Sequence, residues 1–278
     1  MSRSDSPAGQ PVSSPQLGVV FRPQSPPEDL RAVMAAVDAA GVDELWLWED
    51  CFLQGGLTTA AAALALSERV HVGVGLLPVP LRNPALAAME IANLARLWPG
   101  RLTVTLGHGV QEWMAQVGAA VESPLTLLRE HTTAVRDLLS GQEVTMEGRY
   151  VRLDRVRLDW PPQTPPRLLI GARGPRSVGL AGELTDGVLL DSVADADAVR
   201  RAHAELALGR DRGGRALDPR SAVCVYTEVD PMRTAAELNA AVAERVRELG
   251  GAGADSVIFQ ATGQHPSPVP LLEALATT

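Results

Sequence analysis

Three consecutive residues that could exchange protons, Glu49, Asp50 and Cys51, follow an apolar run at residues 44–48. A carboxyl group transfers a proton near neutral pH when burial raises its pKa. A thiol ordinarily titrates near ~8.5, so Cys51 is a poorer base unless its surroundings lower its pKa. We therefore take these three residues as candidate catalytic groups, with the carboxyls as the alternative to the thiol.

A second candidate site is the segment Gly-Ala-Arg-Gly at residues 171–174, which separates an apolar run from a helical pattern. Gly171 and Gly174 let the backbone approach a ligand closely or adopt a positive φ. The first N–H groups of the following helix favour an anion, and Pro175 suits its first position. The segment therefore predicts a site for a cofactor phosphate, although a tight turn in any α/β protein would have a similar sequence.

The composition narrows the class of protein. The 278 residues are 46% hydrophobic and carry a net charge of -8, which argues against nucleic acid or an anionic membrane as a partner. The two cysteines, Cys51 and Cys224, lie far apart without metal-ligand spacing, so we expect a reduced, cytoplasmic protein with no metal. No apolar stretch reaches the ~18 residues that span a bilayer. Residues 1–16 lack the apolar core of a signal peptide and are expected to form a disordered tail.

Strand and helix patterns alternate through the rest of the chain, which predicts one domain over residues 17–278. Helical patterns connect the strands, among them residues 84–97, 124–139 and 235–249. The expected strands are at residues 17–21, 44–48, 70–79, 101–107, 167–170, 187–190, 222–229 and 255–260. Eight such units predict a (β/α)8 TIM barrel. The alternative, an open doubly wound sheet, is weaker because no Gly-x-Gly-x-x-Gly follows the first strand.

Residues 143–154 interrupt this rhythm, because apolar and polar residues alternate there on both sides of Gly148. This pattern predicts a β-hairpin inserted between the fourth and fifth strands of the barrel. Its position suggests a lid over the pocket.

In a TIM barrel the active site lies at the carboxyl ends of the strands. This rule selects residues 49–51, residues 75–80, Gly107 with His108 and Gly109, and residues 171–174. It also selects further residues that follow the remaining strands: Phe21, Arg22, Asp191, Ser192, Glu228 and Gln260.

Several segments in this order resemble the bacterial luciferase-like monooxygenase superfamily, and most closely its branch of F420-dependent oxidoreductases. They are LGVVF with PPEDL, GVDELWLWEDCF, VGVGLLPVPLRNPALAAMEIANL, LGHGVQEWM and GARGPRSVGLAGELTDGVLL. The resemblance covers roughly residues 17–260. It implies a non-prolyl cis peptide in a bulge at Gly75-Leu76, beneath the ring of the cofactor. It also implies that Gly107, His108 and Gly109 lie near the ribityl chain, and that Gly171, Ala172, Arg173 and Gly174 hold the phosphate. On its glycine-flanked loop, His108 is also a candidate catalytic residue, with a neutral surface histidine as the alternative.

One departure concerns the end of the second strand, where many relatives have Asp-His and luciferases have Glu-His-His. Here Asp50 matches the acid and Cys51 takes the place of the histidine. Three interpretations of Cys51 stay open: a small residue that widens the pocket, a thiol that hydrogen-bonds the cofactor, or a reactive catalytic thiol.

The resemblance implies a homodimer that transfers a hydride between F420 and a small organic substrate. One alternative is an FMN-dependent monooxygenase, because FMN and F420 share a ribityl phosphate and a tricyclic ring. Another is a flavin-binding paralogue without turnover, since the usual histidine is missing. F420 also carries a polyglutamate tail, for which Arg22, Arg82 and Arg173 are candidate partners.

Overall fold

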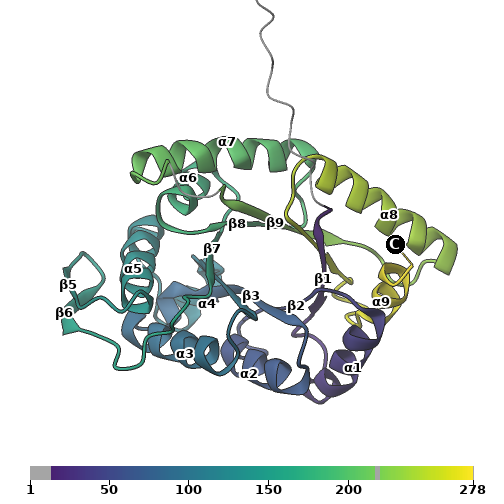
Figure 1. Ribbon diagram of the computed structural model, residues 1–278, viewed down its shortest axis with the longest axis horizontal. Coiled ribbons are helices and arrows are strands. Elements are labelled where there is room, and N and C mark those ends of the chain that lie inside the picture. The colour runs from purple at the N-terminus through teal and green to yellow at the C-terminus, as the bar shows by residue number, and fades with distance from the viewer. Residues whose placement is uncertain (1–13, 217–219, 278) are drawn as a thin grey trace, which may run out of the picture.

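The computed structural model describes residues 14–216 and 220–277. Eight parallel strands close into a barrel in the order β1-β10-β9-β8-β7-β4-β3-β2, and helices surround it on all sides (Figure 1). This arrangement confirms the predicted (β/α)8 barrel. Most of the tail predicted over residues 1–16 lies outside the described residues, and the first strand begins at Gln16.

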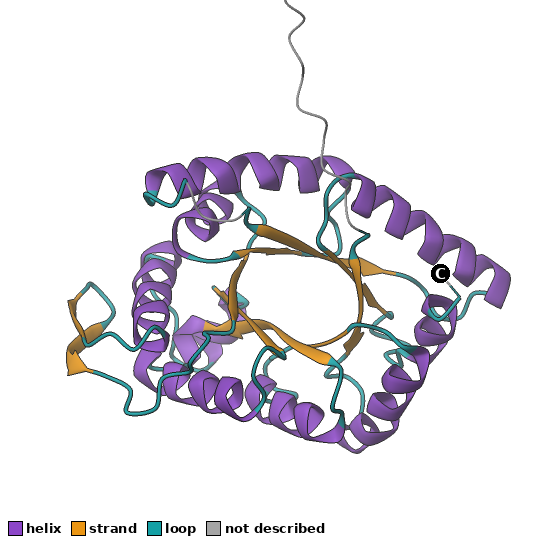
Figure 2. Ribbon diagram, viewed as in Figure 1, coloured by secondary structure: helices purple, strands orange, loops and turns teal. Residues whose placement is uncertain are grey.

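The barrel strands and the helices alternate along the chain, as Figure 2 shows by colour. The strands are β1 (Gln16–Phe21), β2 (Glu44–Leu47), β3 (His71–Pro78), β4 (Leu102–Gly107), β7 (Arg167–Gly171), β8 (Gly187–Leu190), β9 (Ala222–Glu228) and β10 (Ser256–Gln260). The helices are η1 (Pro27–Asp29), α1 (Leu30–Ala40), α2 (Gly56–Leu66), η2 (Val79–Leu81), α3 (Pro84–Leu97), α4 (Gln111–Gln116), α5 (Pro124–Leu139), α6 (Pro175–Leu184), α7 (Ala196–Arg212), α8 (Ala235–Gly251) and α9 (Val269–Leu275).

Local sequence fixes several of these boundaries. Gly41 ends α1 with a positive φ of 72°, a conformation that glycine adopts without penalty. The Asn83 side chain caps α3 by accepting from the Ala85 N–H, and Pro84 occupies the first turn. Thr234 and Glu237 form a reciprocal capping box at the start of α8.

The barrel interior is filled by a cluster of side chains that is separate from the strand–helix core. The cluster comprises Val20, Trp46, Leu169, Leu189, Cys224, Tyr226 and Ile258. Trp46 is its largest member, and its indole N–H donates to Glu44 Oε2 over 2.8 Å. A Cβ at Gly73 would lie 2.3 Å from the Trp46 ring, so the glycine provides the space that this ring occupies.

The inserted hairpin forms as predicted. Strands β5 (Val144–Glu147) and β6 (Arg152–Val156) pair antiparallel and project outside the helical ring next to α5 (Figure 1). The Glu130 carboxylate on α5 accepts the backbone N–H groups of Arg149, Tyr150 and Val151 at 2.8, 2.8 and 3.0 Å. These bonds fix the turn of the hairpin to α5.

Candidate active site

A cavity of about 530 Å³ opens at the carboxyl ends of the barrel strands. It lies within the usual size range of small-molecule sites. Of the candidate catalytic and cofactor-binding residues, all but Cys51 and Gly107 line it, from Glu49 and Asp50 after β2 to Gly171 at the end of β7 and the loop that follows. The other residues selected at strand ends, Phe21, Arg22, Ser192, Glu228 and Gln260, do not line it. Side chains far apart in sequence therefore converge where a barrel enzyme places its chemistry.

Leu76 forms a ledge on one side of this cavity, at a bulge in β3 between Gly75 and Leu77. The Gly75-Leu76 peptide bond is cis, as the resemblance implied. A Cβ at Gly107 or at Gly171 would lie 2.5 or 2.6 Å from Leu76 Cδ2. Gly107 therefore makes room for the Leu76 side chain and does not itself line the cavity.

An aromatic wall that we did not predict from the sequence stands beside this ledge. The Tyr226 hydroxyl donates to the Gly75 carbonyl over 2.8 Å. The Tyr226 ring packs edge-on against Trp46 and Trp48, with centroids 6.0 and 5.7 Å apart. Its signal was its spacing in β9, two residues before the strand-end Glu228, which places both side chains on one face of the strand.

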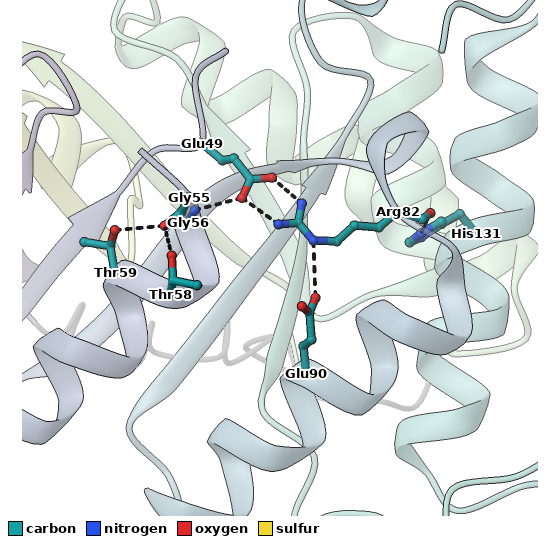
Figure 3. Close-up of polar contacts among 8 residues, drawn as sticks. All are labelled: Glu49, Gly55, Gly56, Thr58, Thr59, Arg82, Glu90 and His131. Carbon is teal, nitrogen blue, oxygen red and sulfur yellow. Dashed lines mark hydrogen bonds and ion pairs between the residues drawn. The ribbon is translucent and has the colours of Figure 1, made fainter. Parts of the chain in front are cut away.

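Glu49 and Asp50 lie side by side but in different environments. Both Glu49 oxygens are engaged: Arg82 donates to each of them, and the Gly56 N–H donates to Oε2 over 2.8 Å (Figure 3). Burial raises the pKa of Asp50, and the positive charge of Arg22 opposes this shift. Burial therefore favours the protonated form of Asp50, whereas the Glu49 carboxylate is held in an ion pair with Arg82.

Cys51 follows these acids in the chain, is partly exposed and does not line the cavity. Burial and the neighbouring charges of Glu49 and Asp50 raise the pKa of its thiol. A reactive catalytic thiol needs the opposite shift. Among the three interpretations of Cys51, this environment therefore disfavours the reactive catalytic thiol.

His108 and the start of α6 also line the cavity. His108 Nε2 lies 3.3 Å from Ser177 Oγ on the first turn of this helix. Burial lowers the pKa of His108, which keeps the ring neutral. Gly174 is the N-cap of α6 in an extended conformation, and no side chain caps the helix. The helix therefore offers its dipole and backbone donors to an anion.

The three arginines expected to meet a polyglutamate tail do not form one groove. Arg22 donates to Glu228 over 3.2 Å and to the Ala261 carbonyl over 2.6 Å. Arg82 pairs with Glu49, and Arg173 pairs with Asp191. Of the three, only Arg173 lines the cavity.

The inserted hairpin does not cover the main cavity, contrary to the expectation of a lid. Hairpin residues Tyr150, Val151 and Arg152 line a second cavity of about 450 Å³, bounded also by Arg82 and by His131 of α5. No residue of the hairpin lines the first cavity. The hairpin is held away from the barrel mouth because Glu130 binds its turn to α5.

Comparison with known proteins decides the family. The sequence matches the luciferase-like monooxygenase family over residues 7–276. The chain belongs to this family. No helix in the described part of the luciferase-like chain is long and apolar enough to cross a membrane. Within residues 14–216 and 220–277, no cluster of three or more His, Cys, Asp or Glu side chains is placed to hold a metal ion.

Individual members of the luciferase-like family resemble the chain at low identity. A 5,10-methylenetetrahydromethanopterin reductase of Methanolobus tindarius is 27% identical over 90% of this chain and 76% of its own. An F420-dependent glucose-6-phosphate dehydrogenase of Nakamurella multipartita is 28% identical over 60% of this chain, which spans 52% of that relative. The solved F420-dependent tetrahydromethanopterin reductase from Methanopyrus kandleri shares the fold, with a TM-score of 0.78 at 17% identity over 95% of this chain and 98% of its own.

Proposed function

We propose that this luciferase-like protein is an F420-dependent oxidoreductase that acts on a small organic substrate. The observation that carries the proposal is the convergence, in one cavity, of the Leu76 ledge, the loop 171–174 and the acid Asp50. The dependence of the relatives above on F420 supports the choice of cofactor.

The residues present fit such a cofactor. Gly75 and Gly171 carry no side chain, which makes room for the Tyr226 hydroxyl and for the Leu76 side chain where a Cβ would meet them. All four residues line the cavity in which a flat ring would lie. Loop 171–174 and the start of α6 would hold a phosphate through backbone N–H groups. Arg173 would add charge, although it is paired with Asp191.

The bound deazaflavin would supply or accept a hydride at its ring. The protein would exclude water through Trp48, Tyr226 and Leu189, which line the cavity. Asp50 would hold a proton for a substrate oxygen, because burial raises its pKa. Neutral His108, which lines the same cavity, would offer a hydrogen bond.

The test is a fluorescence-quenching titration of the purified protein with F420 and, in parallel, with FMN. Selective F420 binding would support the proposal and justify a search for substrates with reduced F420. Binding of neither compound would reject the cofactor site.

The second candidate is an FMN-dependent monooxygenase, because the matched family is described as luciferase-like monooxygenases and FMN shares the ribityl phosphate of F420. Selective FMN binding in the same titration, with oxygen uptake in the presence of reduced flavin, would favour it. A third candidate is the flavin-binding paralogue, for which binding without turnover is the expected result.

We further propose a cytoplasmic homodimer. The cysteines in the described chain are unpaired, which suits a reducing compartment. Helix α3 exposes Leu86, Met89 and Leu97 at 46%, 58% and 59%, which gives an apolar surface for a second copy. A monomer mass in light scattering would contradict the dimer.

A further inference from the structure

Arg82 is a half-buried arginine in the turn between η2 and α3, outside the main cavity. Its guanidinium donates through Nη1 and Nη2 to the two Glu49 oxygens, with 2.8 Å between Nη2 and Oε2. The Arg82 and Glu49 side chains are only 20% and 9% exposed. Such a two-pronged, water-shielded pair fixes the position as well as the charge of the carboxylate.

Further contacts hold Arg82 in place. Its Nε donates to Glu90 on α3 over 3.3 Å. Its backbone carbonyl accepts from His131 Nε2 on α5 over 3.2 Å (Figure 3). On the other side of the pair, Glu49 accepts the Gly56 N–H at the start of α2. Arg82 and Glu49 therefore tie the segment after β2 to three helices.

This segment carries Asp50, which faces the cavity. We propose that Arg82 is a positioning residue that acts through Glu49: it fixes the segment that presents Asp50 and cancels the negative charge next to it. The proposal rests on the proposed function in taking Asp50 as the proton-carrying group.

The charged and titratable groups around Asp50 show why the charge of Glu49 has to be neutralised by Arg82. Arg22 at the end of β1 lowers the pKa of Asp50, against the effect of burial. Tyr226 of β9 and His108 after β4 line the same cavity, and burial keeps both uncharged. Glu49 and Cys51 flank Asp50 in the chain. Without Arg82, the Glu49 carboxylate would be the nearest uncompensated charge.

The first experiment measures the pH dependence of kcat in the full-length enzyme for wild type, Arg82→Met, Arg82→Lys, Glu49→Gln and the Arg82→Met/Glu49→Gln double variant. In Arg82→Met we expect kcat to fall about tenfold to a hundredfold, with a smaller change in KM. We also expect the midpoint of the kcat–pH profile that reports on Asp50 to move up by about one pH unit, because the uncompensated charge of Glu49 favours the protonated form of Asp50. This part of the profile is called the Asp50 limb.

Adding Glu49→Gln to Arg82→Met should return the limb towards wild type. Arg82→Lys should leave the limb in place but lower kcat, because an ammonium group lacks the two-pronged geometry. The matched control is Arg129→Met, which removes an arginine that donates to both oxygens of Glu183 on the protein surface and should leave the profile unchanged.

A second readout needs neither cofactor nor turnover. Burial and then the charge of Glu49 raise the pKa of the Cys51 thiol, whereas Cys224 is fully buried. The pH dependence of Cys51 alkylation by iodoacetamide should therefore move upward in Arg82→Met, downward in Glu49→Gln and close to wild type in the double variant.

The two readouts separate the two ideas. If wild type binds no F420 but the alkylation series moves as expected, the proposed function is rejected and the action of Arg82 on this segment stands. If folded Arg82→Met keeps the wild-type alkylation and pH profiles, the positioning role is overturned. Should Arg82→Met not fold, wild-type kcat and KM in Arg82→Lys would overturn it equally.

Discussion

At the scale of single residues, the shape of the cavity depends on glycines that leave space for larger neighbours. A Cβ at Gly75 would lie 2.4 Å from the Tyr226 hydroxyl oxygen and 2.5 Å from Leu189 Cδ2. We expect Gly75→Ala to lower the free energy of unfolding by about 1–3 kcal/mol through overpacking, as measured by denaturant titration.

The matched control is Gly174→Ala. No atom lies within 4 Å of the Cβ it would add, and its φ of -93° suits alanine. We expect a change within about 0.5 kcal/mol. Equal losses in the two variants would show that backbone freedom, rather than the space beside Tyr226, explains the glycine at position 75.

The sequence predicted the residues that follow the strands better than those within them. Residues 49, 50 and 171–174 were found because strand ends of a barrel meet at one face. Tyr226 was missed because it lies inside an apolar strand, where a buried aromatic residue is ordinary core. The pairing of Glu49 with Arg82, 33 positions apart, was missed because linear sequence does not show which loops face each other.

At the scale of elements, His131 links α5 to the turn that carries Arg82. It is 1% exposed, and burial lowers its pKa to about 4 from 6.5. Between pH 6.5 and about pH 4 the unfolded chain binds more protons at this histidine than the folded protein does. The free energy of unfolding therefore decreases as the pH falls through this range. We expect His131→Gln to reduce the loss of unfolding free energy between about pH 7 and pH 5 by about 2 kcal/mol.

Denaturant titrations at the two pH values measure this difference. His71, whose pKa is also lowered to about 4 by burial, serves as the comparison: its replacement by Gln should have a similar effect, and the two effects should add. An unchanged pH dependence in both variants would mean that neither ring is kept neutral by the fold.

The sequence predicted the strands of the hairpin but not where the hairpin packs. The alternation of apolar and polar residues predicted its two strands. Its packing against α5 depends on Glu130, and the helical pattern of α5 identifies the apolar residues that face the core, not the partner of a polar residue. Likewise α4, with six residues, is too short for a periodic signal.

We expect Glu130→Ala to speed amide exchange at residues 149–151 by about tenfold, because loss of about 1.4 kcal/mol of local stability corresponds to that factor. Hydrogen exchange followed by mass spectrometry measures it. F420 binding should not change, since the hairpin does not line the main cavity. A large loss of binding would restore the hypothesis of a lid.

At the scale of the whole molecule, eight repeats of strand and helix made the barrel predictable, because each repeat gives independent evidence for the same architecture. The cavity at its mouth belongs to no single repeat. It is lined by residues of β3, β8 and β9, by residues that follow β2 and β4, and by the end of β7 with the loop after it. A ligand there therefore contacts most of the barrel.

Such a ligand should stabilise the barrel against global unfolding. At about 100 times its dissociation constant, F420 should raise the free energy of unfolding by about 2.7 kcal/mol. For a chain of this size that corresponds to a Tm increase of roughly 5–10 °C, measured by differential scanning calorimetry. The loop variant Arg173→Ala should weaken binding and need more F420 for the same increase, while Arg129→Ala, outside the cavity, should respond as wild type does. If F420 at saturating concentration left Tm unchanged while FMN raised it, the cavity would instead be assigned to the flavin of a monooxygenase.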